Sequence, residues 1–188
     1  MGARDKVCIF IDGGYVRAML HQYYKDQPID FLRLSDELCQ GCERFRTYYY
    51  ISPPYQSADP TPDERRRKAD MDRFLEKLKL HPRFENRLGR LQRTSDPAHP
   101  FVQKGVDVLL SIDLTQISAS RTVDRAIIVS ADSDFAPAIQ RAKENMMLVT
   151  LASFTEHKSR VLYSVCDERL EITRALIEKI SLKTCCEP

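Results

Sequence analysis

Runs of consecutive apolar residues mark the predicted strands. The segments VCIFI at 7–11 and AIIVS at 126–130 show no alternation of polar and apolar positions, which is typical of strands buried on both faces of a parallel sheet. The runs FRTYYYI at 45–51 and MLVTLA at 147–152 predict two further strands, and residues 84–94 favour an irregular or edge strand. The pattern therefore predicts a sheet of about five strands.

Apolar residues recur at helical spacing between these strands. A helix is predicted after the turn at Gly13 and Gly14, and the other predicted helices lie at about 31–39, 63–80 and 104–117 and from ADSDF (131–135) through about 144, with one or two more near 159–166 and 173–181. Because strands alternate with helices, we expect an α/β fold with a Rossmann-like parallel sheet flanked by helices on both faces.

The length of the chain suits one domain. Its 188 residues contain no internal repeat or low-complexity tract. We expect a single domain over residues 1–188, with a core at about 6–155 and C-terminal helices at about 156–188.

Composition excludes several classes of protein. Hydrophobic residues make up 43% and charged residues 30% of the chain, as in globular proteins of aqueous compartments. No apolar run reaches the length of a bilayer span, and the start MGARDK lacks the apolar core of a secretory signal. These features predict no membrane association and a cytoplasmic location, where the six cysteines would be reduced. Cys39 and Cys42 have metal-ligand spacing, but no second pair completes a zinc site.

Aspartates follow the two most apolar strands at the point where each strand ends. Asp12 comes directly after VCIFI, and Asp132 and Asp134 follow AIIVS. Asp107 lies in the first turn of the helix that leads into the second of these strands. In open parallel sheets, ligands collect beyond the carboxyl ends of the strands. The ends of neighbouring strands are about 4.8 Å apart, near enough for two carboxylates to share one cation. Grouped carboxylates there suit Mg²⁺ or Mn²⁺, which prefer oxygen ligands.

Each of these acids also has an ordinary structural explanation. A single Asp after a strand is usually a turn residue or a helix N-cap, and this applies most to Asp134. The three acids Asp12, Asp107 and Asp132, in matching positions, favour a metal site. Asp113 lies about 120° around its helix from Asp107, so it is expected to support the site from behind or to form a structural ion pair.

At these residues the chain resembles the NYN domain family, in particular its LabA-like branch within the PIN-like nuclease superfamily. The resemblance rests on three blocks in order: FIDGGY at 10–15, KGVDVLLSIDL at 104–114 and IVSADSDFAPAI at 128–139. It implies a PIN-like fold and a divalent-metal site made by Asp12, Asp107 and Asp132, with Asp134 as a fourth acid. Two residues would lie beside that site, Lys104 and Ser130.

Two positions depart from the family pattern. Tyr15 stands where many relatives carry Asn, and Ala131 replaces the usual Gly before the metal-binding Asp. Neither change removes a carboxylate, so they affect substrate positioning, in which Tyr15 is a candidate, more than metal binding.

Substrate contacts are expected from a basic segment. Residues 61–104 hold 12 Lys and Arg against 7 Asp and Glu, a local charge of +5. Arg65, Arg66 and Arg67 are its candidate phosphate contacts, although a solvated helix face would carry similar charges. The run Tyr48–Tyr50 offers rings that could stack on bases. The run also lies in a predicted strand, where core packing is expected for at least one of the three rings.

The predicted function is a divalent-metal-dependent phosphodiester hydrolase, an endoribonuclease that uses a metal-activated water. Its expected cofactor is Mg²⁺ or Mn²⁺, and its expected partner is single-stranded or structured RNA; DNA and a homodimer stay open. One alternative is a catalytically weak RNA-binding or regulatory module with the same fold. Another is a metal-dependent phosphatase, although FIDGGY lacks the second Asp that a phosphoaspartate enzyme of the dehalogenase type requires.

Overall fold

The computed structural model describes residues 5–94 and 101–182. Its main sheet has six strands, all parallel, in the order β3-β2-β1-β6-β7-β8. Two more strands form a separate antiparallel hairpin, β4–β5. The strands are β1 (Lys6–Asp12), β2 (Glu43–Ile51), β3 (Phe84–Leu88), β4 (Arg90–Arg93), β5 (Phe101–Lys104), β6 (Arg125–Val129), β7 (Leu148–Phe154) and β8 (Glu168–Ile172). The helices are α1 (Gly13–Tyr24), α2 (Phe31–Leu38), α3 (Pro62–Lys79), α4 (Val106–Ser120), the short 3₁₀ helix η1 (Ser133–Phe135), α5 (Ala136–Glu144), α6 (Arg160–Val165) and α7 (Arg174–Ile180).

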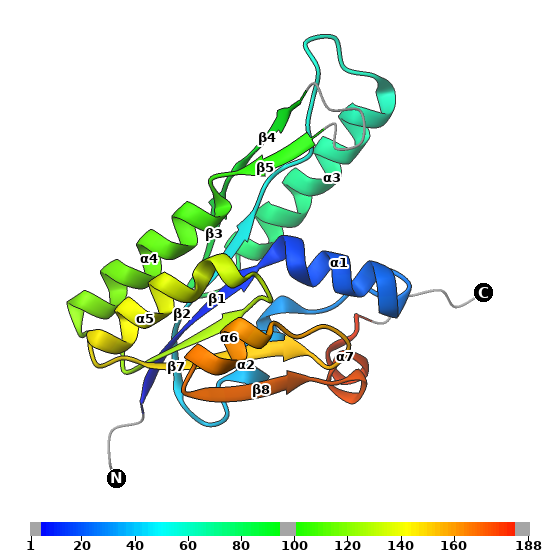
Figure 1. Ribbon diagram of the computed structural model, residues 1–188. Coiled ribbons are helices and arrows are strands. Elements are labelled where there is room, and N and C mark those ends of the chain that lie inside the picture. Colours follow the sequence, from blue (N-terminus) through cyan, green and yellow to red (C-terminus); the bar gives the residue numbers. More distant parts are fainter. Residues whose placement is uncertain (1–4, 95–100, 183–188) are drawn as a thin grey trace.

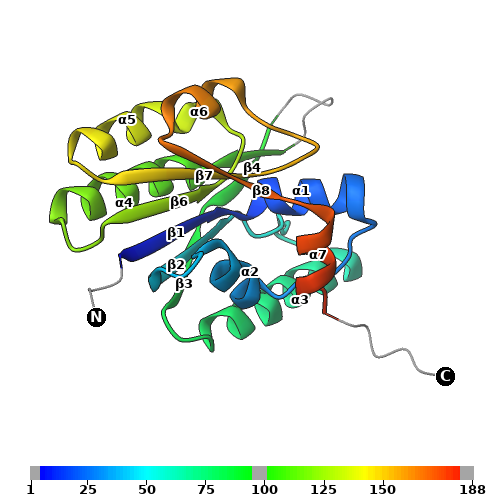
Figure 2. The same cartoon turned by 90° about the horizontal axis from the view of Figure 1, so that it is seen from below.

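The sheet lies between two layers of helices (Figure 2). Alternate residues of β1 face opposite layers: Ile9 and Ile11 pack with α1, α2, α3 and α7, whereas Cys8 and Phe10 pack with α4, α5 and α6. All four side chains are at most 1% exposed. The predicted α/β fold with a parallel sheet and helices on both faces is therefore confirmed.

The sheet is larger than the sequence pattern predicted. Strand β8 was missed because three of the five residues in its sequence, ERLEI, are charged and its side chains are mostly exposed at the edge of the sheet. It pairs with β7, so the sheet continues beyond residue 155, where only helices were expected. The two C-terminal helices occur as predicted, as α6 and α7.

Residues 84–94, predicted as one irregular or edge strand, form two strands: β3 at the edge of the main sheet and β4 of the hairpin. The hairpin β4–β5 itself was not predicted, because four-residue strands carry little periodic signal. It lies beside the outer half of α3, and together they extend beyond the carboxyl edge of the sheet (Figure 1). Gly89 joins the hairpin to β3. A side chain at this position would clash, because its Cβ would lie 2.8 Å from the carbonyl oxygen of Lys104.

The described cysteines are free thiols. Burial raises the pKa of Cys39 to about 11, which disfavours the thiolate that zinc requires. Within residues 5–94 and 101–182, no helix has both the length and the apolar character needed to cross a membrane.

Candidate catalytic carboxylate site

Asp12 lies where β1 passes into α1. It is the N-cap of that helix, and its Oδ1 accepts a hydrogen bond of 3.1 Å from the backbone N–H of Tyr15. The next residue must be glycine, because a Cβ on Gly13 would lie 2.5 Å from Cζ of Tyr49 and 2.8 Å from the Tyr50 carbonyl oxygen. The helix therefore starts directly over β2, and the Asp12 carboxylate is held at the edge of the sheet with only 8% exposure.

The neighbouring strand β6 brings Ser130 and Asp132 to the same place. Ile11 is paired with Val129, so the residues that follow them emerge side by side. The Ser130 hydroxyl donates to Oδ2 of Asp12 at 2.9 Å and accepts from the backbone N–H of Asp132 at 3.1 Å. Ser130 is fully buried, and it fixes Asp12 relative to the loop that carries Asp132.

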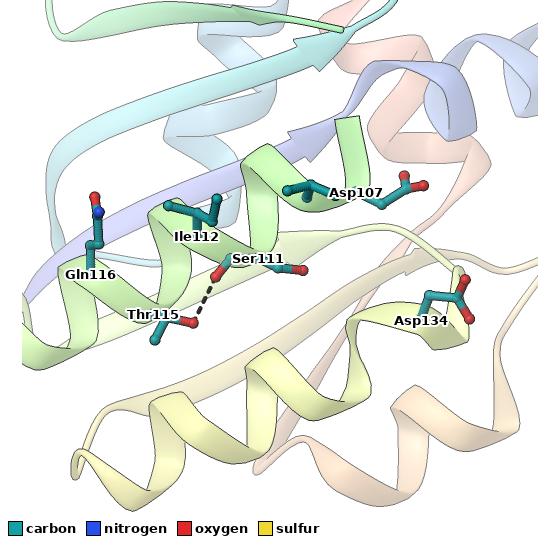
Figure 3. A pocket seen from close by; sticks show the side chains of 7 residues that line it. Asp107, Ser111, Ile112, Thr115, Gln116 and Asp134 are labelled. Carbon is teal, nitrogen blue, oxygen red and sulfur yellow. Dashed lines mark hydrogen bonds between the residues drawn. The ribbon is translucent and has the colours of Figure 1, made fainter. Parts of the chain in front are cut away.

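Asp107 and Asp134 approach from the amino ends of two helices. Asp107 lies in the first turn of α4, after Gly105, whose φ of 89° suits glycine. Asp134 lies in η1, and its N–H donates to Oδ1 of Asp132 at 3.0 Å. Both acids line one end of a shallow groove of about 510 Å³ that continues along α4 past Ser111, Ile112 and Thr115 (Figure 3).

The acids act electrostatically on one another. Burial raises the pKa of Asp12 above its ordinary value of 3.8, the hydrogen bonds from Tyr15 and Ser130 lower it, and the charges of Asp107 and Asp132 raise it further. Burial also raises the pKa of Asp107, and the charges of Asp132 and Asp134 add to this effect. The structure thus brings together all four acids that the sequence singled out, close enough for their charges to repel.

The chemistry of this group fits a divalent cation, because a cation relieves the repulsion among carboxylates and binds to oxygen. In the part of the chain that the structure describes, however, no three His, Cys, Asp or Glu side chains are placed to ligate one ion jointly. Mg²⁺ commonly keeps several waters and binds through one or two carboxylates, and the arrangement suits that mode rather than a closed cage of side chains.

A family model described as the NYN domain matches residues 6–173, which include all four acids. The chain belongs to the NYN domain family. NYN domains are part of the PIN-like nuclease superfamily, and NYN nucleases act on nucleic acid. A comparison with curated proteins found no match. The crystal structure of a protein of unknown function from Vibrio parahaemolyticus is similar, with a TM-score of 0.64 and 22% sequence identity over 92% of this chain and 95% of that one. At that identity the likeness concerns the fold alone.

The basic residues predicted for this NYN domain lie on α3 and at the end of β5. Arg65, Arg66 and Arg67 are exposed in the first turns of α3, at the outer end of the extension (Figure 1). Arg66 and Arg67 both form ion pairs with Asp63, and only Arg67 of the three lines a cavity. Lys104 is exposed at the end of β5, three residues before Asp107.

The tyrosines considered as substrate contacts in this NYN domain are packed inside the protein, so none of them offers an exposed ring. The Tyr15 hydroxyl donates to the carbonyl of His157 at 2.7 Å and accepts from the N–H of Phe154 at 3.0 Å, so it fastens α1 to the end of β7. Tyr48, Tyr49 and Tyr50 are at most 6% exposed, because β2 is an inner strand covered on both faces. None of these rings is free to stack on a base.

Asp113 forms an ion pair. Its Oδ2 accepts from Nε of Arg87 and from the hydroxyl of Tyr50, both at 2.9 Å. These partners lie on β3 and β2 and compensate the charge of Asp113. Of the two roles expected for Asp113, the contacts therefore favour the structural ion pair.

Proposed function

We propose that this NYN domain is a divalent-cation-dependent nuclease that cuts RNA at internal phosphodiesters. The observation that supports this most is the convergence of Asp12, Asp107 and Asp132, separated by up to 120 residues in the chain, at one edge of the sheet. Asp134 is a fourth acid within electrostatic reach of Asp107. Buried or partly buried carboxylates that repel one another are costly for folding, which is expected where they hold a cation for chemistry.

The cation, when bound, makes a water acidic enough to attack phosphorus and neutralises charge on the scissile phosphate and the leaving 3′ oxygen. The chain supplies orientation. Ser130 and the N–H of Tyr15 each hold one oxygen of Asp12, and the N–H of Asp134 holds Oδ1 of Asp132. The products are expected to carry a 5′ phosphate and a 3′ hydroxyl.

Two other functions are distinguishable by experiment. A regulatory module would bind RNA without cutting it, and a phosphatase would release phosphate from small phosphoesters. The presence of all four acids favours catalysis over a purely regulatory role.

The test is incubation of purified protein with labelled single-stranded RNA and Mn²⁺, with and without a chelator. We expect cleavage that needs Mn²⁺ and falls by at least about 100-fold in Asp12→Asn and in Asp132→Asn, because each change removes a charge that no other group replaces. Asp113→Asn is the matched control, since Asp113 is a partly buried acid bound to Arg87, and it should still cut. Cleavage that survives both site substitutions would refute the assignment, and a DNA strand of the same sequence tests the choice of nucleic acid.

A further inference from the structure

A second cavity, of about 830 Å³, lies between α1 and α3 on the opposite face of the sheet from α4. Its apolar wall includes Phe31, Met71 and Phe74, and Arg17 and Arg67 contribute cationic groups. Binding sites for small ligands are typically of this size, mostly apolar, with a few polar groups that fix orientation.

Two buried residues with hydroxyl groups line the cavity. Tyr49 is 0% exposed and Ser52 is 7% exposed, and both residues line the cavity. Among the described residues, neither the Tyr49 hydroxyl nor the Ser52 hydroxyl has a hydrogen-bond partner. Because a buried hydroxyl without a partner costs free energy, its retention needs an explanation, and a ligand that completes the hydrogen bonds supplies one.

The charges around the cavity favour an anion. Arg17 is exposed and has no ion-pair partner in the described part of the chain. Of the two acids in the lining, Asp70 is paired with Arg73, and Asp26 contacts His21. Arg67 shares Asp63 with Arg66. Arg17 therefore offers an unpaired guanidinium to an anion next to an aromatic wall.

The cavity adjoins the acid site. Arg17 follows Asp12 by five residues of α1, a rise of about 7.5 Å along the helix axis. Burial raises the pKa of the Tyr49 hydroxyl, the guanidinium of Arg17 lowers it and the charge of Asp12 raises it, so both charged groups act on this hydroxyl. A chain molecule that occupied the cavity would therefore lie close to Asp12.

We propose that the cavity between α1 and α3 binds one unpaired nucleotide of the strand that the acids cut, with the base against Phe31 and Phe74 and the phosphate near Arg17. This inference rests on the proposed nuclease function. A base held in a duplex cannot enter the cavity, so the substrate is RNA with an unpaired nucleotide next to the cut. Aromatic side chains and arginine are the usual partners of unpaired bases and phosphates.

The test uses full-length Asp12→Asn protein in chelator, so that binding is measured without cleavage or metal. Titration calorimetry compares AMP, adenosine and inorganic phosphate. We expect AMP to bind at least tenfold more tightly than either of the other two, and Arg17→Gln to weaken AMP binding at least tenfold. Arg121→Gln is the matched control, since Arg121 is exposed at the far end of α4, and it should bind AMP like its parent.

Tyr49→Phe separates a ligand role from a structural one. Removal of a hydroxyl that has no partner should leave the unfolding midpoint unchanged or higher, while AMP binding weakens. The inference is overturned if AMP binds no better than phosphate or adenosine, or if both Arg17→Gln and Tyr49→Phe bind AMP like their parent. Such a result leaves the nuclease function intact when the wild-type protein still cuts RNA with Mn²⁺. If the wild-type protein does not cut RNA with Mn²⁺ although AMP still binds, the proposed nuclease function is refuted and the binding site is not.

Discussion

The contacts of Ser130 give this residue a defined task. Its hydroxyl joins the carboxylate of Asp12 to the backbone of Asp132, and the side chain is fully buried. It is a positioning residue, since its proton is already directed at Asp12 and it has no exposed surface for a substrate. The sequence suggested only that Ser130 would lie beside the acids.

Ser130→Ala is expected to weaken Mn²⁺ binding and RNA cleavage by about 10- to 100-fold, because groups that orient metal ligands typically have effects of this size. Calorimetric titration with Mn²⁺ gives the affinity. Ser118→Ala is the control: Ser118 is an equally buried serine whose hydroxyl donates to Thr115, and its loss should lower stability without changing the affinity. Equal Mn²⁺ affinity in the two variants would argue against the role assigned to Ser130.

At the scale of elements, buried strands were predicted more completely than peripheral ones: the edge strand β3 was predicted, but β5 and β8 were not. β1 and β6 are continuous apolar runs, and their parallel pairing brings Asp12 and Asp132 together as the pattern predicted. Strands β5 and β8 are short and lie at the periphery of the fold. Whether such a segment forms a strand depends on the neighbouring strand with which it pairs, and the sequence of the segment does not reveal that neighbour. The same reason explains the tyrosines: whether a ring of β2 faces solvent depends on which helices cover the sheet.

The contact between α1 and the end of β7 gives a test at this scale. Tyr15→Phe removes the hydroxyl that binds both His157 and Phe154, and it leaves the buried N–H of Phe154 without its acceptor. We expect a loss of about 1–3 kcal/mol in the free energy of unfolding. Urea denaturation measures it, beside Tyr163→Phe, which changes a half-exposed ring. RNA cleavage per folded molecule should change little; a loss comparable to that of Asp12→Asn would restore Tyr15 as a substrate contact.

For the whole molecule, we expect the carboxylate site to make stability depend on pH and on divalent cations. Because the folded-state pKa of Asp12 is raised, the folded protein holds a proton more tightly than the unfolded chain, and this contribution to stability is lost as pH rises above the ordinary value of 3.8. In chelator, Asp12→Asn should therefore have a higher unfolding midpoint than wild type, and the difference should grow with pH until Asp12 is fully ionised.

Addition of Mn²⁺ at neutral pH should reverse this order, because the cation stabilises the wild-type carboxylates and finds fewer ligands in the variant. Thermal unfolding followed by circular dichroism, with and without chelator, measures both effects. A midpoint for Asp12→Asn that lies below wild type in chelator at all pH values would show that the Asp12 charge is not strained in the folded protein.

The central claim is that the acids gathered at this edge of the sheet bind a divalent cation, one or two of them directly and the others through their charge, and Mn²⁺ binding tests it most directly. Calorimetric titration should show binding to wild type and to Asp113→Asn, whose acid is occupied by Arg87, and affinities at least about tenfold weaker for Asp12→Asn, Asp107→Asn and Asp132→Asn. Asp107 and Asp113 lie on the same helix, so a general effect of removing charge from α4 would appear in both variants. Equal affinity in all five proteins would contradict the account.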